Sequence, residues 1–141
     1  KPLKMGDHYT YSDEELEVQF RNCEFPAPLF SHEAHLRLAW IHLSRYGPER
    51  AILNITNQLK TYVGFLGAAD KYNETLSVAA VQAVWHFMLR SETDNFRDFI
   101  AENSRLKFNF KELISQHYAS DIFNSDAAKR EYQEPELLPF D

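Results

Sequence analysis

Apolar residues recur every three or four positions along most of the chain, and polar residues that commonly start helices precede several of these stretches. Ser12 and Glu15 have the spacing of a capping box, which predicts a first helix from about Asp13 to Asn22. The two prolines in segment 25–28 end this helix. Because the same period continues towards the end of the chain, the pattern predicts an all-α fold.

The central part of the chain predicts three further helices. Ser31 caps the second helix, which ends before Gly47, and Pro48 stands in the first turn of the third, where proline is tolerated. We expect this turn to join two antiparallel helices, the later of which ends at Gly67. The fourth helix, from about residue 73 to 89, is apolar on almost every side and should therefore lie at the centre of the bundle.

The last third of the chain predicts shorter elements. A fifth helix begins at Asp94, and a sixth lies within residues 110–118. From residue 119 the pattern is irregular, but Leu137, Leu138 and Phe140 indicate that this tail docks on the bundle. We therefore expect a single-domain helical bundle over residues 1–141, with five to six helices, a docked C-terminal tail and a flexible segment 1–11.

Composition and charge exclude some classes of function. The 141 residues are 44% hydrophobic, 14% aromatic and 26% charged, which is typical of a folded globular domain. The net charge of -6, with fifteen Lys and Arg dispersed among acids, disfavours a nucleic-acid surface. The chain contains neither an apolar run long enough to span a membrane nor the pattern of a signal peptide.

The single cysteine bears on the compartment. Cys23 cannot form an internal disulfide or a cysteine-rich zinc site, which fits a reducing compartment. We therefore expect a cytoplasmic protein, although the sequence does not show whether Lys1 is the native start.

Two histidines one helical turn apart are the most informative chemical feature. At about 100° per residue, His32 lies on the apolar face of the second helix and is expected to point into the core, with His35 at the edge of that face. On the fourth helix, Thr75 and His86 lie along one polar edge, and Glu74 stands in the first turn. We expect the two polar edges to converge on one buried pocket.

These residues suggest particular roles. His32 and Glu74 are candidates for catalytic proton transfer, and His32, His35 and Glu74 for a divalent metal ion. The candidates for contacting a small ligand are Asn73, Thr75, His86, Trp40 and Arg37. Each also has an ordinary alternative. The histidines can be structural and bonded to a carbonyl or tyrosine, Glu74 can be a favourable first-turn acid, Trp40 can be a packing residue, and Arg37 can lie on the surface.

Three segments together resemble an uncharacterised family of small, all-helical bacterial proteins: Phe30–Trp40, Lys71–Ser77 and the tail from Tyr118 to Pro139. The family motifs are Phe-Ser/Thr-His-x-x-His-Leu-Arg-x-Ala-Trp and Lys-Tyr-His/Asn-Glu-Thr. The resemblance implies no activity. It does imply that Asn73 occupies a position where relatives carry a third histidine, so that this chain would bind a metal more weakly if that histidine is a ligand.

The leading hypothesis is a buried His- and Glu-lined pocket that binds a small polar ligand or a metal ion and could be catalytic. The alternative is a non-catalytic interaction or regulatory module whose buried histidines are structural. A homodimer built through an aromatic face is a third hypothesis. The sequence alone does not decide whether the protein is an enzyme, nor does it identify a ligand, a cofactor or the oligomeric state.

Overall fold

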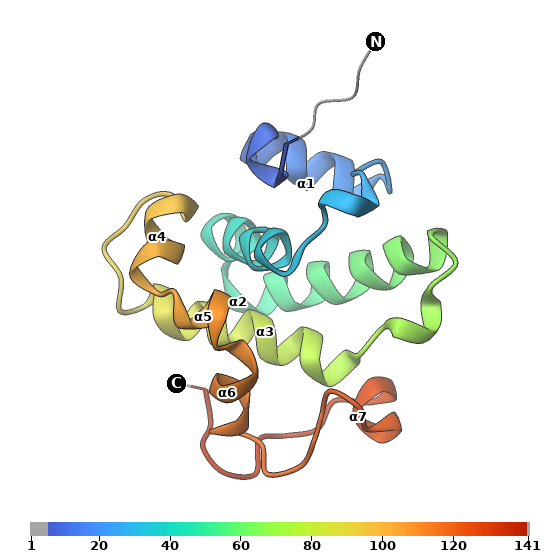
Figure 1. The fold of residues 1–141 in the computed structure, drawn as a ribbon, viewed down its shortest axis with the longest axis vertical. Coiled ribbons are helices and arrows are strands. Elements are labelled where there is room, and N and C mark those ends of the chain that lie inside the picture. Colours follow the sequence, from blue (N-terminus) through green and yellow to red (C-terminus); the bar gives the residue numbers. More distant parts are fainter. Residues whose placement is uncertain (1–5, 141) are drawn as a thin grey trace.

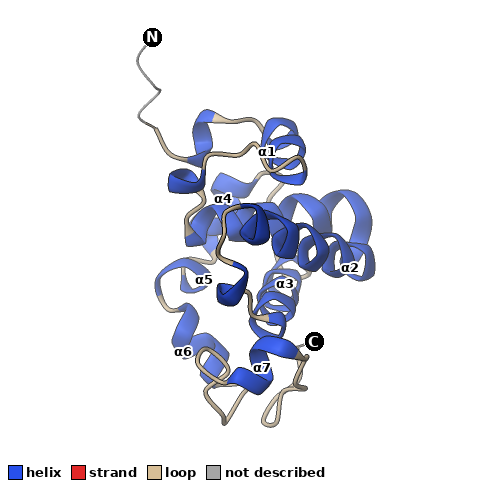
Figure 2. Cartoon of the chain, turned by 90° about the vertical axis from the view of Figure 1, so that its right-hand side faces the viewer, coloured by secondary structure: helices blue, strands red, loops and turns tan. Residues whose placement is uncertain are grey.

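The computed structural model describes residues 6–140, which form helices and loops without a strand (Figures 1 and 2). This confirms the predicted all-α class. The α-helices are α1 Asp13–Arg21, α2 His32–Phe65, α3 Glu74–Met88, α4 Phe96–Glu102, α5 Arg105–Phe108, α6 Phe110–Ser115 and α7 Asp126–Arg130. Three short 3-10 helices complete the set: η1 His8–Thr10, η2 Ala27–Leu29 and η3 Ala69–Lys71. None of the described helices is both long and apolar enough to cross a membrane.

Gly47 divides α2 into two halves. Its backbone torsions, φ 82° and ψ 171°, are not helical, and Pro48 follows in the first turn of the second half. The predicted break is therefore present. The expectation of two antiparallel helices is wrong, however, because Figure 1 shows the first half nearly end-on and the second half running across the view. With its positive φ, Gly47 redirects the chain within one residue, without the longer loop that would lay two helices side by side.

The core forms around α2, whose first half is buried on most sides, and around α3, which packs against α2 (Figure 1). The middle of α3 is buried on most sides and consists mainly of alanine and valine, which allow close helix approach. The prediction that this helix is central is confirmed.

The first helix covers the other side of α2. Ser12 and Glu15 form the predicted capping box at the start of α1, and Phe20 is fully buried. The Phe20 ring lies 4.5 Å, centroid to centroid, from that of Tyr62 in the second half of α2. The Tyr62 hydroxyl donates to the carbonyl of Phe25 at 2.8 Å, which fixes the loop after α1.

Both ends of the described chain pack on the bundle. Residues 1–5 lie outside the described part, whereas His8, within the segment expected to be flexible, is buried in η1. In the tail, the Tyr118 hydroxyl donates to the carbonyl of Gln133 at 2.8 Å. Phe140 is half-buried whereas Leu137 and Leu138 remain exposed, so the tail docks through Ile122, Ala128 and Phe140 and not through the two leucines.

Candidate functional site

A cavity of about 270 Å³ lies between the two halves of α2, the start of α3 and the segments around α6. We call it the histidine pocket. Because Gly47 redirects α2, His32 and His35 from its first half share this cavity with Leu59 and Val63 from its second half. The remaining lining residues are Lys71, Tyr72, Asn73, Leu76, Ser77, Ala80, Phe110 and Phe123.

Most of the histidine pocket is apolar, and several of its polar groups already have partners. The Ser77 hydroxyl donates to the carbonyl of Asn73 at 2.7 Å. The Asn73 side chain caps α3 by accepting from the amide of Leu76 at 2.9 Å, and its Nδ2 donates to the carbonyl of Ile122 at 2.7 Å. These contacts fix the pocket wall and leave the two imidazoles as its distinctive chemistry.

His32 stands at the rim. Its Nε2 lies 2.9 Å from the carbonyl oxygen of Leu106, so Nε2 carries the proton and donates it. In the neutral ring, Nδ1 is then an acceptor. The residue is exposed, and the expectation that it points into the core is wrong. As the first residue of α2, His32 has no helical turn before it, and helical side chains lean towards the N-terminus, so its ring extends beyond the helix end.

His35 has a different environment. Its Nε2 is buried and has no hydrogen-bond partner among the described residues. Burial, with a smaller contribution from the nearby His32, lowers the pKa of His35 to about 4. The ring is therefore neutral at pH 7, with one nitrogen that donates and one that accepts. Buried side-chain nitrogens nearly always have a partner, so this atom, like Nε2 of His8 and His42, is an exception that needs an explanation.

The structure does not bring Glu74 to the two histidines. The Tyr72 hydroxyl donates to Glu74 Oε1 at 2.6 Å, and Lys60 Nζ lies 3.5 Å from the same oxygen. Among residues 6–140, no group of three or more His, Cys, Asp and Glu side chains could hold a metal ion. The predicted set of three metal ligands and the predicted His32–Glu74 catalytic pair are therefore not assembled.

Thr75 and His86 also lie away from the histidine pocket. The Thr75 hydroxyl donates to the carbonyl of Glu131 and accepts from the amide of Gln133, both at 3.0 Å, so it holds the tail. His86 lies near the end of α3, where Arg90 donates to its carbonyl at 2.8 Å. The polar edge of α3 thus divides between tail docking and a second cavity.

Trp40 and Arg37 do not line the histidine pocket. Trp40 is buried, and its ring lies 6.2 Å from that of Phe96, centroid to centroid. The buried guanidinium of Arg37 donates to the carbonyls of His8 and Tyr11, at 2.8 and 2.9 Å, and to the Asp13 carboxylate at 2.8 Å. It connects the N-terminal segment to α2. Neither the surface position considered for Arg37 nor its ligand role fits this geometry.

The sequence did not predict the aromatic wall of the histidine pocket, which Phe110 and Phe123 form. Phe110 lies 4.8 Å from the His32 ring, and Phe123 lies 6.4 Å from Phe110, both centroid to centroid. In the sequence, Phe110 appears only as part of a helical stripe and Phe123 as part of the irregular tail. No local signal indicates that they meet, because the contact joins segments far apart in the chain.

No protein-family model, curated protein or solved structure matches this chain. Function is therefore inferred from the chemistry of the site. That chemistry is a mainly apolar cavity with a neutral, buried imidazole whose hydrogen bonding is incomplete.

Proposed function

We propose that this chain binds a small, mainly apolar molecule in the histidine pocket, and that one polar group of the ligand completes the hydrogen bonding of His35. The buried, unpartnered Nε2 of His35 beside a cavity carries this proposal. Leaving such an atom unpaired destabilises the fold by about 1–3 kcal/mol. A bound ligand that pairs with it would recover much of that free energy.

The dimensions and lining of the pocket support a ligand of this kind. A cavity of about 270 Å³ is near the lower end of the range for ligand pockets, so it suits a molecule the size of one substituted ring. Phe110 and Phe123 offer aromatic surface to such a ring. Because burial keeps His35 neutral, we infer recognition by a hydrogen bond to a hydroxyl or amide.

A small molecule is better supported than a metal ion. His32 and His35 supply two imidazoles, and neither the amide of Asn73 nor the hydroxyl of Ser77 is available as a further ligand, since both are hydrogen-bonded within the fold. The alternative of purely structural histidines requires a closed network of hydrogen bonds. The unpartnered His35 nitrogen argues against such a network.

Phenol and toluene provide a direct test. The two probes have similar apolar bodies, but only phenol has a hydroxyl that can pair with His35. At pH 7 we expect phenol to bind about tenfold more tightly than toluene, which corresponds to one net hydrogen bond of about 1.4 kcal/mol. Chemical-shift titration of the ¹⁵N-labelled protein measures both affinities and locates the bound probe.

Two variants separate the hydrogen bond from the cavity. In His35→Leu, the preference for phenol should disappear while toluene still binds. His86→Leu, which replaces a histidine of α3 outside this pocket, should retain the preference. The proposal fails if neither probe shifts the signals of pocket residues, or if His35→Leu keeps the preference for phenol.

A further inference from the structure

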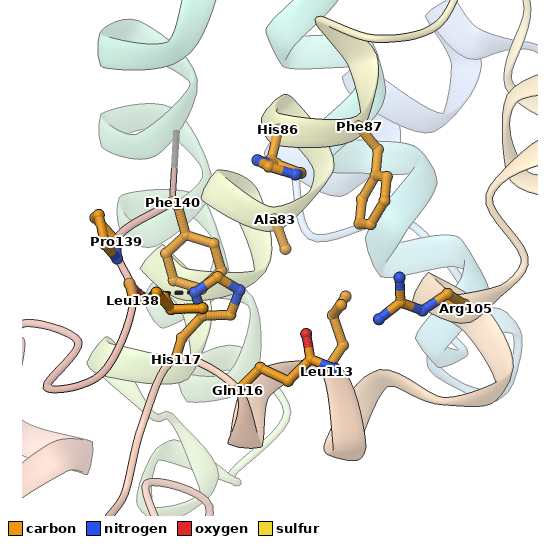
Figure 3. A pocket seen from close by; sticks show the side chains of 10 residues that line it. All are labelled: Ala83, His86, Phe87, Arg105, Leu113, Gln116, His117, Leu138, Pro139 and Phe140. Atoms are coloured by element: carbon orange, nitrogen blue, oxygen red, sulfur yellow. Dashed lines mark hydrogen bonds between the residues drawn. The ribbon is translucent and has the colours of Figure 1, made fainter.

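A second cavity, of about 300 Å³, lies between α3, α5, α6 and the C-terminal tail (Figure 3). We call it the tail pocket. It is lined by Ala83, His86, Phe87, Arg105, Leu113, Gln116, His117, Leu138, Pro139 and Phe140. Its lining shares no residue with the histidine pocket, so the two cavities can be tested independently.

The tail pocket has a positive charge without a partner within the described chain. Arg105 is exposed on α5, and its guanidinium forms no hydrogen bond or ion pair with residues 6–140. Figure 3 shows this side chain reaching towards the space beside Leu113. None of the described residues that line the cavity is acidic. In a chain with a net charge of -6, an unpaired guanidinium in a recess favours the binding of an anion.

The opposite wall is aromatic and held in place. His117 Nδ1 lies 2.8 Å from the carbonyl oxygen of Leu138, to which it donates its proton. The ring of His117 stacks on that of Phe140, with centroids 3.9 Å apart and planes tilted by 21°. Figure 3 shows this stacked pair across the opening from Arg105, with Gln116 between them. The cavity therefore places a flat apolar wall opposite a guanidinium.

Together these features select a class of ligand. A guanidinium pairs with the two oxygens of a carboxylate through parallel hydrogen bonds. The Gln116 amide adds a donor beside it, while Phe87, Leu113 and Phe140 offer apolar surface to an organic body. We propose that the tail pocket binds a small organic carboxylate, whose carboxylate pairs with Arg105 and whose ring or chain packs against the Phe140 wall.

Benzoate is the probe that tests this proposal. At pH 7 and low ionic strength, benzoate should shift the amide signals of α5, α6 and the tail, with a dissociation constant on the order of 1 mM. Benzyl alcohol, which lacks the charge, and inorganic phosphate, which lacks the apolar body, should each bind at least about tenfold more weakly. The signals of histidine-pocket residues should not follow the benzoate titration.

Paired charge substitutions make the assignment specific. Arg105→Gln should weaken benzoate binding about tenfold. Arg50→Gln removes the same charge from an exposed position on α2 outside the pocket, and should change the affinity less than twofold. The proposal is overturned if benzoate shifts no tail-pocket signal, if phosphate or benzyl alcohol binds as tightly, or if Arg105→Gln binds benzoate as the native chain does.

Discussion

His32 and His35 lie one helical turn apart at the start of α2, yet their Nε2 atoms have opposite environments. The Nε2 of His32 donates to the carbonyl of Leu106 at 2.9 Å, whereas the Nε2 of His35 is buried without a partner among the described residues. Helical phase predicted the reverse order, with His32 in the core and His35 at the edge of the apolar face. In the fold, His32 is a rim residue whose tautomer is fixed by its hydrogen bond, whereas His35 is a neutral residue whose Nε2 lacks a hydrogen-bond partner. The first prediction follows from this difference.

The stability of the fold should fall in acid partly because of His35. Its pKa is about 4 in the folded chain against an ordinary value of 6.5, so between these values the unfolded chain binds more protons. Lowering the pH through this range therefore lowers the free energy of unfolding, by about 2 kcal/mol after allowance for solvent screening, since His35 as a whole residue is only partly buried although its Nε2 is fully so. Urea denaturation of the native chain and of His35→Leu at a series of pH values measures the difference.

The His35→Leu variant should lose about 2 kcal/mol less than the native chain between about pH 6.5 and about pH 4. Burial also lowers the pKa values of His8 and His42, so part of the acid sensitivity should remain in the variant. Identical pH profiles for the two proteins would mean that His35 is not buried as a neutral group.

Arg37 should be a major contributor to stability. Its buried guanidinium donates to two backbone carbonyls and to Asp13, so removing it leaves several acceptors without a donor. We expect Arg37→Met to reduce the free energy of unfolding by about 3 kcal/mol. Asp13→Asn is the matched control, since that carboxylate is 43% exposed, and should cost about 1 kcal/mol or less.

Hydrogen exchange locates the effect of Arg37. The amides of residues 8–11 should exchange much faster in Arg37→Met than in Asp13→Asn, because the guanidinium holds that segment on α2. Equal protection of these amides in the two variants would contradict this assignment.

Local signals in the sequence were sufficient for much of the fold. The capping box at Ser12 and the caps at Ser31 and Asn73 are visible as residue types at fixed spacings, and the structure has helices starting directly after them. The break at Gly47 was also predictable from the local sequence, because glycine and proline determine the backbone torsions at their own positions. The direction of the chain after Gly47 depends on torsion values that residue types do not specify.

The site was harder to predict because its contacts are between segments far apart in the chain. Helical phase placed His32 on the apolar face but could not show that a first-turn residue extends beyond the helix end. Glu74 has the same first-turn position in α3, and it pairs with its neighbour Tyr72. Of the five residues expected to line one pocket, only His32 and His35 line the histidine pocket, which also includes the second half of α2 and the segments around α6.

The backbone at Gly47 should not tolerate a side chain. Its φ of +82° with ψ of 171° is essentially restricted to glycine, although a Cβ would meet no atom within 4 Å. We expect Gly47→Ala to destabilise the fold by about 2 kcal/mol through backbone strain alone. Gly64→Ala, in a helical and equally open position of α2, should instead stabilise it by about 0.5–1 kcal/mol. Thermal unfolding of both variants measures this difference in stability. A loss of stability in both would indicate steric clashes of the added methyl groups instead of backbone strain.

Replacing Asn73 by histidine should create a zinc site in the histidine pocket. Asn73 lines the same cavity as His32 and His35, so a third imidazole there would complete a three-nitrogen ligand set. The change removes the cap of α3 and the hydrogen bond to Ile122, so without metal Asn73→His should be less stable by about 1–2 kcal/mol. Added Zn²⁺ should then raise its melting temperature, since a ligand that binds only the folded state stabilises it.

Asn73→Ala loses the same cap without gaining an imidazole, and its melting temperature should not respond to Zn²⁺. Equal responses of the two variants would show that residue 73 does not face the two histidines closely enough to share a metal ion.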